Sequence, residues 1–418
     1  MRGRAFFCAA VTLCLLLPPP LPVMGQSERS DAEQAIDQLL EERASALLER
    51  DRSAFLATVL PGADAFKRRQ ALLFDRLGNI PLGSLRYEVA WNAYGDLART
   101  SDKQAYPDAD DLRIPLTIEH YEIAGYDKRA VVQDLYLTFV RDGDAWFIGN
   151  DADLDDIGFL TQRNPWDLGD VALTEGKNIV ALSSGCGGAA CGGVPELLDA
   201  AEGAMEQVDR YWDRPWNRRV PFFAPDDAAD LAKIIQATFS VENYVAFAFW
   251  TGGAGRSEGA RIIADPSVFE SAGFDRSFSI LAHELTHVAT LPYRGSFMPR
   301  FLDEGFAQYV QYDAAGRVPT VFDAAVRASG DATLPEDYTF FIGDSGDVQL
   351  VYQKSLSAVS FIAERWGEGR VTRLYRAIGS SGGDIGTATH HVDEAFKKVL
   401  GMGVDAFEKV WASSIVGL

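Results

Sequence analysis

Two segments near the start of the chain carry apolar residues at spacings of three and four, which is the period of an amphipathic helix. They are "DAEQAIDQLLEERASALLERDRSAFLATV" and "FKRRQALLFDRLGNIPLG", and Gly78 and Pro81 end the second of them. Alternating apolar and polar positions follow in "SLRYEVAWNAY", "LRIPLTIEHYEIAG" and "AVVQDLYLTFVRDGDAWFIGNDAD". These runs predict strands, and "RDGDAW" predicts a hairpin turn. The pattern therefore indicates helices followed by a curved antiparallel sheet.

The pattern changes near residue 165, where we place a domain boundary. An amphipathic helix is predicted over "PELLDAAEGAMEQVDRYWD". Three short strands follow, "RRVPFFAP", "NYVAFAFW" and "GARIIADP", with the helix "DDAADLAKIIQATF" after the first. The later segments are helical in pattern. We predict an α+β protein, with an N-terminal domain of helices and a curved antiparallel sheet over residues 26–165 and a small mixed sheet followed by a helical half over residues 166–418.

Residues 1–25 have the pattern of a signal peptide. Arg2 and Arg4 precede "AFFCAAVTLCLLL", an apolar run too short to span a membrane, and Gly25 suits the cleavage position. A lipoprotein anchor at Cys14 is disfavoured, because Leu13 stands where such signals have a small residue. No later apolar run reaches membrane-spanning length. The sequence predicts a protein that is secreted or resides in the cell envelope, with no stable membrane anchor.

The charge and the cysteines narrow the possible partners and the compartment. The net charge is −21, so nucleic acid is not expected as a partner. Loss of the signal peptide would leave Cys186 and Cys191 in "SSGCGGAACGGVP", and an oxidising compartment predicts one disulfide between them. The acidic run "NDADLDDIG" lacks the glycine turn and the distal Glu of a calcium loop, and predicts a solvated loop instead.

Two of the five histidines lie four residues apart in "SILAHELTHVATLPY". On a helix, His283 and His287 share one face and can point at one ion. Glu284 is turned by about 100° from His283, which suits a general base that reaches water without binding the metal. The alternative is an ordinary helix with packed histidines. Zinc hydrolases need a third protein ligand, which therefore decides between the two interpretations.

"HELTH" followed by a helix reading "FLDEGFAQYV" resembles the gluzincin metallopeptidases, and among them the peptidase MA-like group of exported proteins. The resemblance covers about residues 195–415. It implies one Zn²⁺ per chain with His283, His287 and Glu304 as ligands, and Glu284 as the base. It also implies that Tyr352 donates a hydrogen bond to the oxyanion.

Two further features accompany this resemblance. Asp303 stands where many relatives have Asn or Ser, and it either hydrogen-bonds a ligating histidine or caps the helix. The helix-then-sheet order of residues 26–165 resembles the cone-shaped folds of the SnoaL-like, or nuclear transport factor two-like, superfamily.

We predict an exported zinc metallopeptidase that acts on peptide or protein substrates. "GAMEQ" resembles the segment by which aminopeptidases of this kind hold a free amine, but it lies inside an amphipathic helix far from His283, so an endopeptidase-like cleft is expected. One alternative is a zinc hydrolase of amidase or deformylase type; resemblance to deformylases would imply that Cys186 is a ligand. The other is a non-catalytic ligand-binding protein with a structural zinc.

Overall fold

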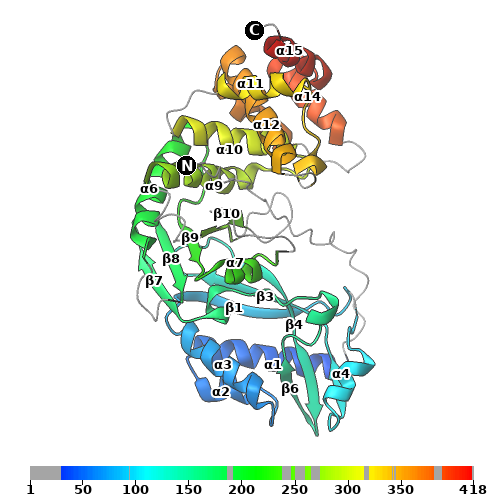
Figure 1. The fold of residues 1–418 in the computed structure, drawn as a ribbon. Helices are drawn as coiled ribbons and strands as arrows, with labels where there is room; N and C mark the ends of the chain where they lie inside the picture. Colours follow the sequence, from blue (N-terminus) through cyan, green and yellow to red (C-terminus); the bar gives the residue numbers. More distant parts are fainter. Residues whose placement is uncertain are drawn as a thin grey trace.

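The fold is α+β, as predicted, with antiparallel sheets in the N-terminal part and a helical half in the C-terminal part (Figure 1). The computed structural model describes residues 30–93, 95–185, 192–237, 246–249, 259–264, 274–314, 320–340, 342, 345–380 and 388–416. The predicted signal peptide, Cys186 and Cys191 lie outside these ranges. Within them, no helix combines the length and the apolar character needed to cross a bilayer.

The N-terminal part confirms the predicted order of helices and strands. It begins with α1 (Asp31–Leu48), α2 (Arg52–Ala57) and α3 (Asp64–Leu77). Ser30 caps α1 through a capping box with Glu33, since each side chain accepts a hydrogen bond from the other's backbone N–H. One antiparallel sheet has the order β1 (Leu82–Val89), β3 (Leu116–Ile123) and β4 (Val131–Tyr136). The other has the order β2 (Asp111–Arg113), β5 (Thr138–Asp142) and β6 (Ala145–Asn150), and the predicted hairpin joins β5 to β6.

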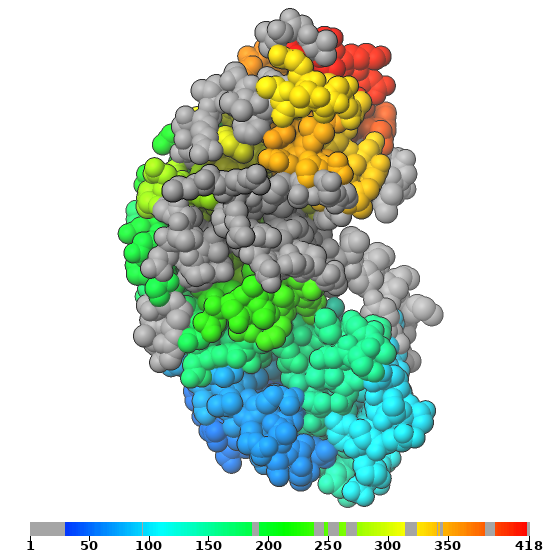
Figure 2. All heavy atoms as spheres, viewed as in Figure 1, coloured from blue at the N-terminus to red at the C-terminus, as the bar shows by residue number. Residues whose placement is uncertain are grey.

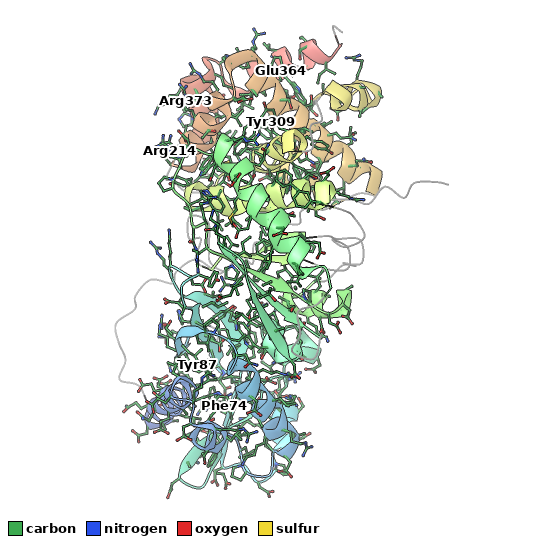
Figure 3. All side chains as sticks on the ribbon, turned by 90° about the vertical axis from the view of Figure 1, so that its left-hand side faces the viewer. Phe74, Tyr87, Arg214, Tyr309, Glu364 and Arg373 are labelled. Carbon is green, nitrogen blue, oxygen red and sulfur yellow. The ribbon has the colours of Figure 1, made fainter. Side chains whose placement is uncertain are left out.

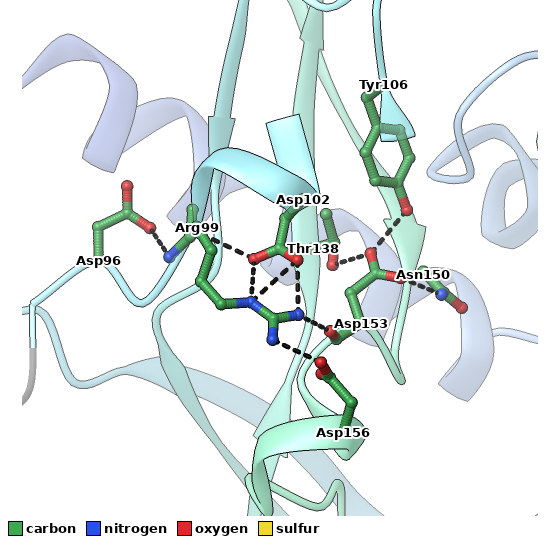
Figure 4. A network of polar contacts seen from close by, with 9 residues as sticks. Asp96, Arg99, Asp102, Tyr106, Thr138, Asn150, Asp153 and Asp156 are labelled. Atoms are coloured by element: carbon green, nitrogen blue, oxygen red, sulfur yellow. Dashed lines mark hydrogen bonds and ion pairs between the residues drawn. The ribbon is translucent and has the colours of Figure 1, made fainter. Parts of the chain in front are cut away.

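The acidic run after β6 is not a simple solvated loop, because its carboxylates are held by polar partners (Figure 4). Arg99, just before α4 (Thr100–Ala105), donates to Asp156 at 2.7 Å and to the carbonyl of Asp153 at 2.7 Å. The Asp153 carboxylate also accepts from the hydroxyls of Tyr106 at 2.8 Å and Thr138 at 2.7 Å. These contacts tie the segment containing η1 (Asp155–Ile157) to the N-terminal domain.

A five-stranded mixed sheet forms the centre of the molecule. Its order is β10 (Ala246–Phe249), β11 (Arg261–Ala264), β9 (Val220–Ala224), β8 (Ile179–Ser184) and β7 (Val171–Glu175). β9 runs parallel to both β8 and β11, whereas β10 and β7 are antiparallel to their neighbours. The sequence analysis predicted β9, β10 and β11 and missed β7 and β8.

Most helices of the second half lie on one side of this sheet and continue to the C-terminal end of the molecule (Figure 1), whereas α7 (Ala228–Ile234) packs on the other side. Figure 2 shows the N-terminal part and the C-terminal helices at opposite ends. The remaining helical elements are α5 (Pro165–Leu168), α6 (Val194–Tyr211), α7 (Ala228–Ile234), α9 (Phe274–Thr290), η2 (Leu291–Tyr293), α10 (Arg300–Ala314), α11 (Thr320–Ser329), η3 (Asp337–Phe340), α12 (Ser345–Trp366), α13 (Gly369–Gly379), α14 (Ala388–Leu400) and α15 (Val404–Val416).

The two faces of the central sheet belong to different hydrophobic cores. On β10, Ala246 and Ala248 join the core formed with α6 and α9. The alternate residues Phe247 and Phe249 join a second core, which includes Tyr121 of the N-terminal domain. Successive residues of a strand point to opposite faces, so β10 packs against both halves of the chain, one on each face. The boundary near residue 165 remains a prediction, but the apolar core is continuous across it.

A buried ion pair joins the same two halves. Both terminal nitrogens of Arg261, on β11, donate hydrogen bonds to the Asp127 carboxylate, at 2.6 and 2.7 Å. Both side chains are almost fully buried. Asp127 follows β3, so this bidentate contact fixes β11 to the N-terminal sheet.

Candidate metal centre and active site

Helix α9 carries the two histidines on a buried, rigid mount. Its residues Ile280, Leu281 and Leu285 pack into the core around the central sheet, and every residue of α9 from Ser279 to its end is buried. His283 and His287 lie one turn apart and bring their Nε2 atoms within 3.2 Å of each other. The predicted helical spacing therefore produces the expected convergence of two imidazoles.

Glu304, in the first part of α10, completes a group of three donors. Its Oε2 lies 3.5 Å from Nε2 of His283 and 3.5 Å from Nε2 of His287. Its other oxygen, Oε1, lies 3.6 Å from Nη1 of Arg300, one turn earlier on α10. The carboxylate is thus oriented with one oxygen toward the histidines and the other toward a cation.

The three donors fit a tetrahedral zinc ion. Bonds of 2.0–2.1 Å at tetrahedral angles place ligand atoms about 3.3 Å apart, and the observed separations are 3.2, 3.5 and 3.5 Å. All three residues are buried, and within the described ranges they are the one group of three or more potential metal ligands whose donor atoms converge. Three protein ligands leave the fourth position open, as a catalytic zinc site requires.

The outward-facing nitrogens of both imidazoles have partners. Nδ1 of His283 lies 3.1 Å from Oε1 of Gln311, and because that oxygen can only accept, Nδ1 carries the proton and Nε2 presents its lone pair to the centre. Nδ1 of His287 lies 3.7 Å from Oδ1 of Asp303. These contacts orient the two rings in the way that outer partners of zinc-binding histidines do.

Asp303 is itself held in place by two partners, of which Tyr375 is fully buried and Arg294 partly buried. The Tyr375 hydroxyl donates to Oδ1 at 2.7 Å, and Nε of Arg294 lies 3.3 Å from Oδ2. Asp303 is buried and faces His287, so its geometry matches the histidine-partner alternative from the sequence analysis.

The electrostatics of this group are those of a coupled buried pair. Burial lowers the pKa of His287, but Glu304 and Asp303 outweigh it and raise that pKa to about 10. Burial raises the pKa of Glu304, but His287 and His283 outweigh it and lower that pKa to about 2. The negative charge of the carboxylates therefore demands a positive charge at the centre, which a proton on His287 or a bound divalent cation can supply.

Glu284 points from α9 to the edge of the central sheet. Its Oε2 accepts a hydrogen bond from the backbone N–H of Ala248, on β10, at 2.7 Å. Burial raises the pKa of the Glu284 carboxyl, although His283 and His287 act in the opposite direction. A carboxylate with a raised pKa is a better proton acceptor near neutral pH, which suits a general base.

Tyr352 lies on α12 and is buried beside Phe340, with the two ring centroids 5.3 Å apart. Helix α12 meets α10 closely, since a Cβ added at Gly305 would lie 2.5 Å from the carbonyl oxygen of Ser355. Tyr352 precedes Ser355 by one turn, on the helix that packs beside Glu304. Its role as oxyanion donor remains a prediction.

The sequence analysis missed several residues that the structure brings to this site, among them Gln311, Tyr375 and Ala248. A signal existed for Gln311, which follows Glu304 by two helical turns and so lies on the same face of α10. Ala248 acts through its backbone N–H, which nearly every residue type has, so the sequence could not identify it.

A helix with two converging histidines, a third ligand on the following helix and a mixed sheet beside them define a metallopeptidase-type domain of zincin-like fold. The sequence comparison agrees, because residues 235–417 match the family model of the Peptidase MA superfamily. This match supports a zinc-dependent peptidase at the level of the superfamily. No curated protein was found to match the chain.

Proposed function

We propose that this chain is an exported zinc endopeptidase, with His283, His287 and Glu304 as the metal ligands and Glu284 as the general base. The observation that carries the proposal is the triangle of buried donor atoms, with sides of 3.2, 3.5 and 3.5 Å. It is supported by the Peptidase MA match, which covers all four residues. We further propose that the N-terminal part is a SnoaL-like domain, supported by its three leading helices, α1 to α3, and its two antiparallel sheets.

In this proposal the chain's own residues would have the following catalytic and positioning roles. Zinc in such sites supplies Lewis acidity and allows water to lose a proton near neutral pH. Glu284 would accept that proton and return it to the leaving amine, and the Ala248 N–H would hold its carboxylate in position. Gln311 and Asp303 would keep the imidazoles aligned. Tyr352 would donate a hydrogen bond to the oxyanion that develops on the scissile carbonyl.

The first experiment measures zinc per chain and cleavage of unfolded casein by the mature protein, by Glu284→Gln and by a control, Glu206→Gln. Glu206 is an exposed residue of α6 and should be neutral. We expect one zinc in all three proteins and cleavage by the wild type and the control alone. If none of the proteins binds zinc, the proposal is wrong. Cleavage by Glu284→Gln at the wild-type rate would refute the role of Glu284.

Two further measurements address the finer parts of the proposal. Cys186→Ser should leave the zinc content unchanged, and a loss of zinc would favour the deformylase-like alternative. Export predicts that protein recovered from outside the cytoplasm begins after the signal peptide, near Gln26. Intact residues 1–25 on all recovered protein would contradict that prediction.

A further inference from the structure

A cavity in the N-terminal domain lies between α1, α3 and the β1-β3-β4 sheet, and α5, just past the predicted boundary, also lines it. Its volume is about 60 Å³, enough for roughly four to six waters or a solute of similar size. Charged and aromatic side chains line this space, among them Arg43, Glu119, Asp167, Tyr87, Tyr121 and Trp166. Figure 3 shows Tyr87 and Phe74 in this domain, at the opposite end of the molecule from Arg373.

Both arginines in the cavity wall are already engaged, and Arg163 donates to the Asp151 carboxylate at 2.7 Å. Arg43 donates to Thr58 at 2.9 Å and to Gln70, and its guanidinium lies 3.9 Å above the ring of Phe55. Arg43 is on α1, and its partners belong to α2 and α3, so these contacts hold the three helices together. Because its guanidinium is already held by these partners, Arg43 does not offer a free counter-ion for a ligand anion.

Of the three acidic side chains in the wall, Asp151 is ion-paired with Arg69 and Arg163, whereas the other two are not neutralised in this way. Neither Glu119 nor Asp167 has an ion pair with a lysine or arginine among the described residues; Glu119 accepts from Gln133, and Asp167 accepts from the backbone N–H of Asn164 at 2.7 Å. Burial, together with the charge of Asp167, raises the pKa of Glu119 to about 7, and burial raises that of Asp167 to about 6. A cation in the cavity would stabilise the charged forms of these two carboxylates, which burial disfavours.

The aromatic walls favour an organic cation over a metal ion. Tyr121 and Trp166 form an edge-to-face pair with centroids 5.4 Å apart, and aromatic rings attract ammonium groups. The only convergent group of three or more metal-ligating side chains in the described ranges is the one at His283, so the cavity offers too few carboxylates for a bound metal. A small ammonium ion matches both the charge and the volume.

A chain of contacts leads from the cavity to Glu284. Glu119 accepts from Gln133, Gln133 accepts from Asn164 at 3.2 Å, and Asn164 accepts from the Tyr121 hydroxyl at 3.1 Å. The guanidinium of Arg261 lies 5.7 Å from the ring centroid of Tyr121. Arg261 is on β11, which pairs with β10 at Phe249, next to the Ala248 amide that binds Glu284.

We propose that this cavity binds a small organic ammonium ion between Glu119 and Asp167, and that its occupancy is transmitted through Tyr121 and Arg261 to β10 and Glu284. The second half of this proposal rests on the proposed peptidase function. The core residues Phe247 and Phe249, which pack with Tyr121 and Trp166, supply an apolar path parallel to the polar one.

Binding is tested by calorimetry on the mature protein with methylammonium, ethanolammonium and tetramethylammonium. Ethylene glycol, an uncharged match to ethanolammonium, is the control ligand. We expect at least one ammonium ion to bind, and its affinity to fall at least tenfold in Glu119→Gln/Asp167→Asn. Glu122→Gln, on the same strand but outside the cavity lining, should bind as the wild type does. Binding of glycol equal to that of ethanolammonium, equal affinity in the double variant, or no binding of any ammonium ion would overturn the proposal.

Transmission is tested with a readout that needs no hydrolysis. Hydrogen exchange of residues 246–249 should slow at least threefold when the ligand is bound, and kcat/KM for casein should change by about fivefold. Tyr121→Phe removes only the hydroxyl that reaches Asn164, so it should keep ligand affinity within threefold and reduce both effects, while the ring contact with Arg261 and the apolar path remain. Ligand binding with unchanged exchange at β10 would overturn the transmission. A change in exchange without casein cleavage would support the transmission from the cavity to β10. That outcome would contradict only the proposed peptidase function.

Discussion

The contact between α10 and α12 at Gly305 gives a prediction in which local and tertiary effects have opposite signs. A methyl group at this position would lie 2.5 Å from the carbonyl oxygen of Ser355 and 2.8 Å from Cγ2 of Val359, whereas real Cβ atoms essentially never approach closer than 3.0 Å. In Gly305→Ala one of the two helices must therefore move by at least about half an ångström. Glu304 precedes Gly305, so the metal ligand moves with it.

The magnitudes favour a loss of stability. Alanine is better than glycine inside a helix by about 1 kcal/mol, but inserting an atom into a packed core costs about 1–3 kcal/mol. Because the clash is with backbone, which cannot rotate away, we expect the upper end of this range and a net loss of about 1–2 kcal/mol. Metal sites tolerate displacements of about 0.2 Å, so zinc affinity should fall at least tenfold.

Urea unfolding and a competitive zinc titration would measure the two effects. Gly203→Ala in α6 is the matched control, because the atoms nearest to its added Cβ belong to the ring of Phe278, at 3.0 and 3.3 Å, and a side chain can shift. The control should keep wild-type zinc affinity and lose little or no stability. Wild-type stability and zinc affinity in Gly305→Ala would refute the argument that this close approach positions Glu304.

Three further predictions concern other contacts. Gln311→Ala should weaken zinc binding by about 10–100-fold in a competitive titration, because the His283 ring loses its partner, while Gln308→Ala, on the same helix, should not. Asp127→Asn should lower the free energy of urea unfolding by about 3–5 kcal/mol, because it leaves the Arg261 charge buried; a loss below 1 kcal/mol would contradict this. Glu119 has its pKa raised from 4.5 to about 7 on folding, so wild-type stability should fall by up to about 3 kcal/mol as the pH rises from 4.5 through 7. Glu119→Gln should lack that decrease when unfolding is compared at pH 5 and pH 8, and an identical pH profile would contradict the assignment.

Local periodicity was enough to predict the helix that carries His283 and His287, because ligand spacing and helical spacing coincide there. It was not enough for β8, in which every residue from Ile179 to Ser184 is buried. A strand covered on both faces loses the alternation of polar and apolar positions, so the pattern offers no sign of it. Strand β7 was missed together with its partner.

The same distinction explains what could be foreseen at the metal centre. Glu304 follows the recognisable "HELTH" motif in the sequence, and Gln311 lies on the same face of α10 as Glu304. Tyr375 and Ala248 reach the site from α13 and β10, far apart in the chain, and only the tertiary fold brings them together. Asp303 was ambiguous in the sequence because its partner, His287, is on a different helix.

The apolar face that the central sheet turns toward the N-terminal domain limits how the chain can be divided. Removing residues 26–165 would take away the N-terminal members of the core that contains Val180, Leu182, Phe223, Phe247, Phe249 and Ile263, and would expose part of this face to water. A contiguous apolar patch of this kind promotes aggregation, so a truncated peptidase fragment should be insoluble rather than deregulated. The two halves should instead melt together in a single calorimetric transition, and a protease should cut the connection between them only when the whole chain unfolds.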